Sequence, residues 1–88
     1  MSSKSDGIRV WLVERGYDNR DLIILKYATP EGNRVYRKEV ASQALETVTA
    51  AKVVSPDDLG TVEDPDVRER YADEVGRMVN NRDPDEPV

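Results

Sequence analysis

Cysteine and histidine are both absent from this chain of 88 residues. Without cysteine there is no disulfide framework, no thiolate zinc site and no thiol nucleophile. Without histidine, the usual general base at neutral pH is missing. Catalysis would depend on carboxylates, Lys, Tyr or Ser, and no pair of these has a spacing that indicates general acid and base roles. The sequence therefore predicts a protein that is not an enzyme.

Long apolar runs are missing as well. None exceeds four residues, the length of residues 22–25, whereas a membrane-spanning helix needs roughly 20. Residues 1–7 contain no apolar run of the kind found in a signal peptide. We expect a cytoplasmic protein without membrane contacts. Because so short a chain builds only a thin core, no pocket for a small-molecule substrate is expected either.

Lysine is scarce among the charged residues, with four Lys against nine Arg, and ten Asp accompany eight Glu. The formal net charge is -5, but the first half of the chain is slightly basic and the second half strongly acidic. This composition resembles that of small uncharacterised acidic proteins of the haloarchaeal type. The resemblance is compositional and implies no function. At molar salt the Debye length is about 3 Å, so net acidity would be poor evidence against nucleic-acid binding.

Three segments have the β-branched and aromatic composition of strands: residues 8–15, 22–29 and 33–40. The second is apolar on both alternating faces near its start, which predicts the central strand. Between the second and third, Pro30 and Gly32 stand where a tight hairpin turn with a bulge needs them.

The position of Gly32 sets the expected strand register. With a bulge at Gly32, Ala28 lies opposite Arg34 and Lys26 opposite Tyr36. In this register, the face predicted to line the core carries Ile23, Leu25, Tyr27 and Val35.

Apolar residues at spacings of three and four predict two helices after the strands. The first stripe consists of Ala41, Ala44, Leu45, Val48 and Ala51. The second begins at Asp64 and Pro65, typical of a helix start, and continues with Val67, Tyr71, Val75 and Val79. Between them, residues 55–60 predict one capped helical turn.

The predicted fold class is α+β: a three-stranded antiparallel β-meander followed by two helices packed on the sheet. Residues 8–81 form the expected single domain, between a disordered N-terminal tail at 1–7 and a disordered acidic C-terminal tail at 82–88.

The first candidate site is a basic and aromatic sheet face that would bind nucleic acid, with phosphates paired to cations and a base stacked on a tyrosine. A three-stranded sheet backed by a helix resembles the AP2-type and integrase arm-type DNA-binding domains, which read the major groove with a sheet. The resemblance is topological, and no residue role is carried over. The simpler interpretation is an ordinary solvent-facing side of a small sheet. The candidate residues are Lys26, Arg34, Tyr36 and Lys38.

The second candidate site is a protein-interaction surface. Trp11 lies on the opposite strand face from Val10 and Leu12, so both faces of the first strand carry large apolar side chains. Tryptophan is enriched at protein interfaces. Packing in the core is the alternative for Trp11 and for the second helix. The candidate residues are Trp11, Val13, Tyr71 and Met78. A non-enzymatic interaction module, acting as a homodimer, adaptor or regulator, is the first functional hypothesis; nucleic-acid binding is the alternative.

Acidic residues gather between positions 57 and 66. They lack the alternating spacing and the closing bidentate Glu of a calcium loop. They do fall at the predicted helix starts, where the helix dipole favours carboxylates. We therefore expect helix capping and no metal or other cofactor.

Overall fold

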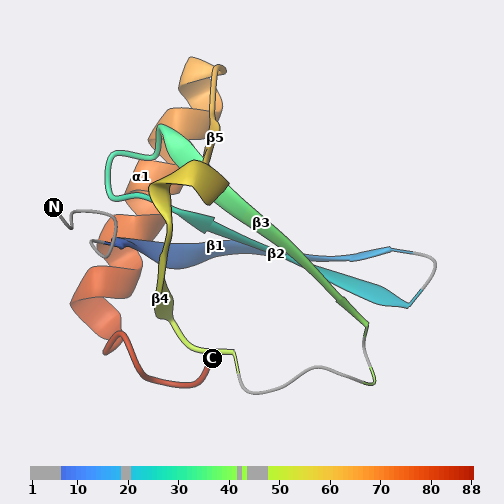
Figure 1. The fold of residues 1–88 in the computed structure, drawn as a ribbon. Coiled ribbons are helices and arrows are strands. Elements are labelled where there is room, and N and C mark those ends of the chain that lie inside the picture. The colour runs from blue at the N-terminus through green and yellow to red at the C-terminus, as the bar shows by residue number, and fades with distance from the viewer. Residues whose placement is uncertain (1–6, 19–20, 42, 44–47) are drawn as a thin grey trace, which may run out of the picture.

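The structure is a computed structural model that describes residues 7–18, 21–41, 43 and 48–88. Five antiparallel strands form one sheet in the order β4-β1-β2-β3-β5, and one long helix crosses one of its faces (Figure 1). The strands and helices are β1 Ile8–Asp18, β2 Leu22–Ala28, β3 Arg34–Ala41, β4 Ala51–Val54, the 3-10 turn η3 Pro56–Asp58, β5 Gly60–Thr61 and α1 Pro65–Asn81.

The predicted fold class is wrong, because a five-stranded sheet with one long helix replaces the three-stranded meander with two helices. Ala51, assigned to the first helix, begins β4, and Val48, which precedes that strand, is not helical. Ala44 and Leu45 lie outside the described residues. The β-branched residues around Val48 favour a strand, and small residues at positions 50 and 51 allow this edge to pack against Trp11.

The central meander and its turn are confirmed. β2 lies in the middle of the sheet, and Gly32 has a positive φ of 75°. The register is shifted by one residue from the prediction. The Thr29 N–H donates to the carbonyl of Arg34, so the ladder extends one residue further and Ala28 lies opposite Val35. Thr29 is buried, and its hydroxyl bonds to Asn33, which holds this end of the turn closed.

Apolar side chains are buried on both faces of the sheet. On the face that α1 covers, here called the helix face, Trp11 and Ala28 pack against Tyr71 and Val75 of the helix. The other side, here called the back face, has its own buried cluster, which consists of Val10, Ile23, Leu25, Tyr27, Val48 and Val54. The prediction that Ile23, Leu25 and Tyr27 share a core face is therefore confirmed, but Val35 lies on the helix face.

Helix α1 begins as its sequence indicates. Asp64 caps the N-terminus by accepting from the Asp66 N–H at 2.9 Å, and Pro65 occupies the first turn. Tyr71 and Val75 are its buried residues, whereas Val79, assigned to the same stripe, is 50% exposed. Of the helices in the described ranges, none is long and apolar enough to cross a membrane.

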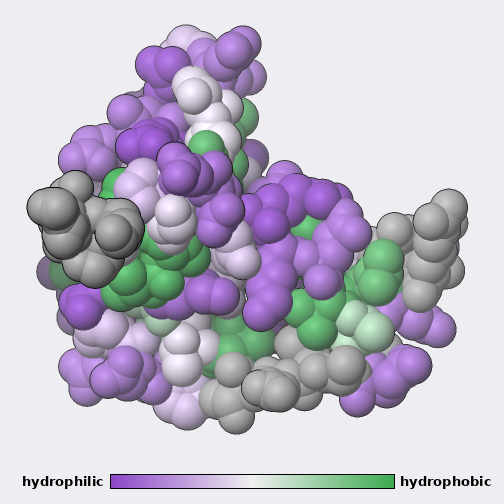
Figure 2. Space-filling model, in the orientation of Figure 1, coloured by the Kyte–Doolittle hydropathy of each residue, from purple (hydrophilic) through white to green (hydrophobic). Residues whose placement is uncertain are grey.

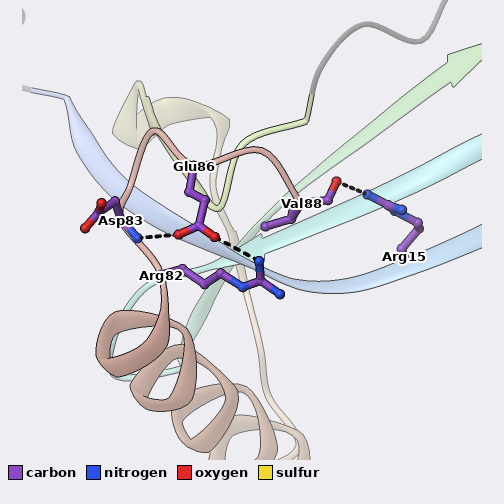
Figure 3. A network of polar contacts seen from close by, with 5 residues as sticks. All are labelled: Arg15, Arg82, Asp83, Glu86 and Val88. Atoms are coloured by element: carbon purple, nitrogen blue, oxygen red, sulfur yellow. Dashed lines mark hydrogen bonds and ion pairs between the residues drawn. The ribbon is translucent and has the colours of Figure 1, made fainter.

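The segment after α1 returns along the start of β4 (Figure 3). The N–H groups of Ala50 and Ala51 donate to carbonyls at Glu86 and Pro84, and Val88 donates back to Val48. Arg82 and the Asp83 N–H hold the Glu86 carboxylate, and these bonds keep its pKa below the ordinary value. The residues predicted as a tail without core contacts thus lie against the sheet edge.

Candidate functional site

A group of cations lies on the back face of the sheet. Alternation along β3 places Arg34, Tyr36 and Lys38 on the same side as the buried Tyr27 and Leu25. Lys52 of β4, opposite Val10, projects from the same face. We call these residues, with Tyr27 beneath them, the back-face cluster: Tyr27, Arg34, Tyr36, Lys38 and Lys52.

Lys52 sits over two tyrosine rings in this cluster. Its Nζ is 5.0 Å from the ring centroid of Tyr36 and 5.6 Å from that of Tyr27. The two rings are 6.0 Å apart and inclined by 47°. These distances are those of cation–π contacts, which hold an ammonium close to an aromatic surface without neutralising its charge.

The surroundings of Lys52 in this cluster lower its pKa. Partial burial, and then the positive charge of Lys38, lower the pKa of Lys52 below its ordinary value. Burial also raises the pKa of the Tyr27 phenol, as does Tyr36, so that this group stays neutral. The ammonium of Lys52 is therefore partly desolvated next to another cation. A bound anion would stabilise its charged form.

Charged strand residues divide by face. Glu14 and Glu39 lie on the helix face, together with Lys26 and Arg37. The Arg37–Glu39 pair forms a salt bridge there. Among the strand positions whose side chains the structure describes, the back face carries cations and no carboxylate: Arg15, Arg34, Lys38 and Lys52.

The structure brings together three of the four predicted nucleic-acid candidates. Arg34, Tyr36 and Lys38 share the back face, but Lys26 lies opposite Arg37 on the helix face. The one-residue register shift causes this, because it moves every β3 side chain to the other face relative to β2. Sequence reasoning missed Lys52, which follows directly after the predicted first helix and was given no role. Recognising residues 51–54 as a strand with alternating side chains would have found it.

The predicted protein-interaction candidates lie around α1 and the middle of β1. Trp11 is buried, only 6% exposed, so it belongs to the core and not to an exposed surface. Val13 is the extra residue of a bulge in β1, and with Met78 it packs at the margin of the helix-face core. Val13, Tyr71 and Met78 line two adjoining hollows of about 280 Å³ each between β1 and the helix.

The edge of this groove is polar and carries both signs of charge. The Tyr71 hydroxyl donates to Oε1 of Glu14 at 3.0 Å, and the Arg70 guanidinium lies 5.6 Å from the Tyr71 ring centroid. Glu74 pairs with Arg77 at 3.2 Å. Burial, followed by the hydrogen bond to Glu14, raises the pKa of Tyr71 above its ordinary value. The groove thus carries no single charge that selects one class of ligand.

The raised pKa of Tyr71 predicts a loss of stability at alkaline pH. The folded state holds the phenolic proton more tightly than the unfolded state, so this contribution is complete below about pH 10 and is lost as the pH rises through the folded-state pKa. We expect Tyr71→Phe to lose about 1 kcal/mol at neutral pH, the value of one hydrogen bond. The free energy of unfolding of the variant, measured with urea from about pH 8 to pH 11, should then fall less than that of the wild type. If the free energies of unfolding of the two proteins changed with pH in parallel, the raised pKa of Tyr71 would be contradicted.

Comparison with protein families matches residues 4–88, nearly the whole chain. The chain belongs to DUF7967, a family of unknown function. No curated protein matches this DUF7967 member. No solved structure matches it either. Membership of DUF7967 brings no activity or ligand, so function has to be argued from the side chains.

Proposed function

We propose that this protein binds single-stranded nucleic acid through the back-face cluster. The observation that carries the proposal is the combination of cations and tyrosine rings on one face: Lys38 and Lys52 lie beside Tyr36, and no strand carboxylate whose side chain is described shares that face. Proteins that bind single strands use this combination, in which cations follow the backbone and aromatic rings stack on bases.

The accessibility of the cluster supports a chain-like ligand. Lys38 is exposed, and Tyr36 and Lys52 are half-buried, so their polar ends can meet a ligand without unfolding the core. On the side of the molecule shown in Figure 2, hydrophilic surface predominates and hydrophobic atoms reach the surface only in separate patches. This surface suits a polar partner better than a broad apolar one.

The acidic residues nearby limit where phosphates would lie. Arg34 donates to the carbonyl of Pro56 at 3.3 Å, and the exposed carboxylates of Asp57 and Asp58 follow directly. A polyanion is repelled at that end of the cluster. Lys38 and Lys52 are therefore the cations that contact phosphate, while Arg34 holds η3 against the sheet.

Fluorescence anisotropy with a labelled single-stranded oligonucleotide tests the proposal. The double variant Lys38→Ala/Lys52→Ala should bind at least about tenfold more weakly at low salt, and the slope of log K against log salt should fall by about 0.7 for each phosphate that no longer pairs with a cation. The matched control is Lys26→Ala/Arg37→Ala, which removes the same net charge from the helix face.

Two results would overturn the proposal. Equal losses of oligonucleotide affinity in the two double variants would show that binding depends only on net charge. Equal competition by inorganic polyphosphate and by unlabelled oligonucleotide would show that the bases make no contact, and the ligand would then be a simple polyanion.

A further inference from the structure

Among the described residues, the second half of β1 has a paired strand on one side only. β4 pairs with β1 only from Ile8 to Trp11, and the Ala50 carbonyl accepts from Leu12. In an antiparallel pair, successive residues point their backbone N–H and C=O groups alternately toward and away from the partner strand. After the bulge, those of Arg15 and Tyr17 point away from β2. In the part of the chain that the structure describes, no other strand pairs with them. A row of unpaired donors and acceptors of this kind is a template for another strand.

Two residues on this edge have no explanation inside one molecule. Gly16 lies inside the strand, two residues before its end, without a positive φ, and an added Cβ would meet nothing within 4 Å. Glycine weakens a strand interior and often marks a place where another backbone approaches closely. Tyr17 beside it is 75% exposed, the most exposed of the large hydrophobic side chains in the described residues.

We infer that the β1 edge pairs with the same edge of a second copy of this chain, in antiparallel fashion, about a twofold axis at Gly16. The backbone N–H and C=O groups of Arg15 in each copy then bond to those of Tyr17 in the other copy. The two Gly16 residues lie opposite each other. Both side chains project from the back face, so Arg15, whose guanidinium donates to the Val88 carbonyl at 3.4 Å within one chain, would turn from Val88 to the Tyr17 ring of the partner copy. Such a contact is isologous and closes at two copies.

The β3 edge is a less suitable partner strand, although it too extends beyond its neighbour. β5 covers only Arg34 and Val35. The open part carries the consecutive charges of Arg37, Lys38 and Glu39. Twofold pairing there centred on Lys38 would place two exposed lysines opposite each other at the axis itself, where β1 has a glycine. In the β1 register the like-charged pair, Glu14 with Asp18 of the partner copy, lies two residues from the axis.

Pairing at β1 would affect how the protein binds nucleic acid. The inference of a dimer does not depend on the proposed function. A twofold axis perpendicular to the sheet keeps the back faces of both copies on the same side. The two back-face clusters would then flank one continuous sheet and offer one nucleic-acid strand two sets of cations. If the chain proves monomeric but still binds oligonucleotide, only the present inference fails.

A cysteine at the axis tests the pairing directly, because the chain has no other thiol. Opposite residues of a non-hydrogen-bonded antiparallel pair have Cα atoms about 4.5 Å apart, within the range for a disulfide. With a mild oxidant such as diamide, Gly16→Cys should form a covalent dimer rapidly at micromolar concentration. The control Gly76→Cys, in α1, also meets nothing within 4 Å and should stay monomeric.

Light scattering on uncross-linked protein completes the test. The wild type should show a mass near twice the 9.9 kDa of one chain. Tyr17→Pro should be a monomer with an unchanged circular dichroism spectrum, because the N–H that proline removes points away from β2. Glu39→Pro makes the matching change on the β3 edge and should leave the dimer intact. A monomeric wild type, equal cross-linking of both cysteine variants, or dissociation by Glu39→Pro alone would overturn the inference.

Discussion

Gly32→Ala is expected to lower the free energy of unfolding by about 3 kcal/mol or more. Gly32 has a φ of 75°, a conformation that costs an L-residue about 1–2 kcal/mol. A Cβ there would also clash with the Arg68 carbonyl oxygen and lie only 2.7 Å from the Ala72 nitrogen. Both atoms are backbone of α1, so the helix or the turn has to move, and such overpacking costs about 1–3 kcal/mol.

Gly76→Ala is the matched control for this substitution. Gly76 lies in α1, where an added Cβ meets nothing within 4 Å. Alanine is the better helix former, so this variant should gain about 0.5–1 kcal/mol. Urea unfolding followed by the fluorescence of the single Trp measures both changes. If the two variants differed little in stability, the close approach of the hairpin turn to α1 would be contradicted.

Trp11→Ala is expected to cost about 3–5 kcal/mol, the range for a large aromatic residue removed from a core. Trp11 connects β1, Ala51 of β4 and the buried residues of α1, so its removal leaves a cavity between all three. Small domains have only about 5–15 kcal/mol of stability, so this loss removes a large share of it and should lower the melting temperature strongly.

Tyr17→Ala, on the same strand, is the control for Trp11→Ala. Because Tyr17 is highly exposed, its removal should change the stability of the monomer by no more than about 0.5 kcal/mol. Thermal unfolding followed by circular dichroism, at a protein concentration too low for self-association, compares the two variants. A mild effect of Trp11→Ala would show that the helix face is not the main core.

The elements with strong local signals could be predicted from the sequence. Asp64 and Pro65 mark the start of α1, and Ser55 caps η3 by accepting from the Asp57 N–H. Gly32 marks the hairpin turn. The helix predicted at residues 41–51 was wrong because alanines at helical spacing also suit an edge strand that must pack closely against Trp11. Long-range pairing, which local spacing does not encode, decides between the two.

The candidate site could be predicted only in part, for a related reason. Arg34, Tyr36 and Lys38 alternate along one strand, so their common face follows from local geometry. Adding Lys26 required the register between two strands, and the hydrogen bond from Thr29 to Arg34 shifts that register by one residue. Lys52 reaches the cluster only because β4 pairs with β1.

Nuclear magnetic resonance of the labelled protein, titrated with a short single-stranded oligonucleotide, shows residue by residue whether the back-face cluster binds nucleic acid. We expect the largest chemical-shift changes at Tyr36, Lys38 and Lys52, and these changes should reach a plateau as oligonucleotide is added. The chemical shifts of Lys26, on the opposite face, should change little. Saturating changes confined to the helix face, or none at all at low salt, would contradict binding at the back-face cluster.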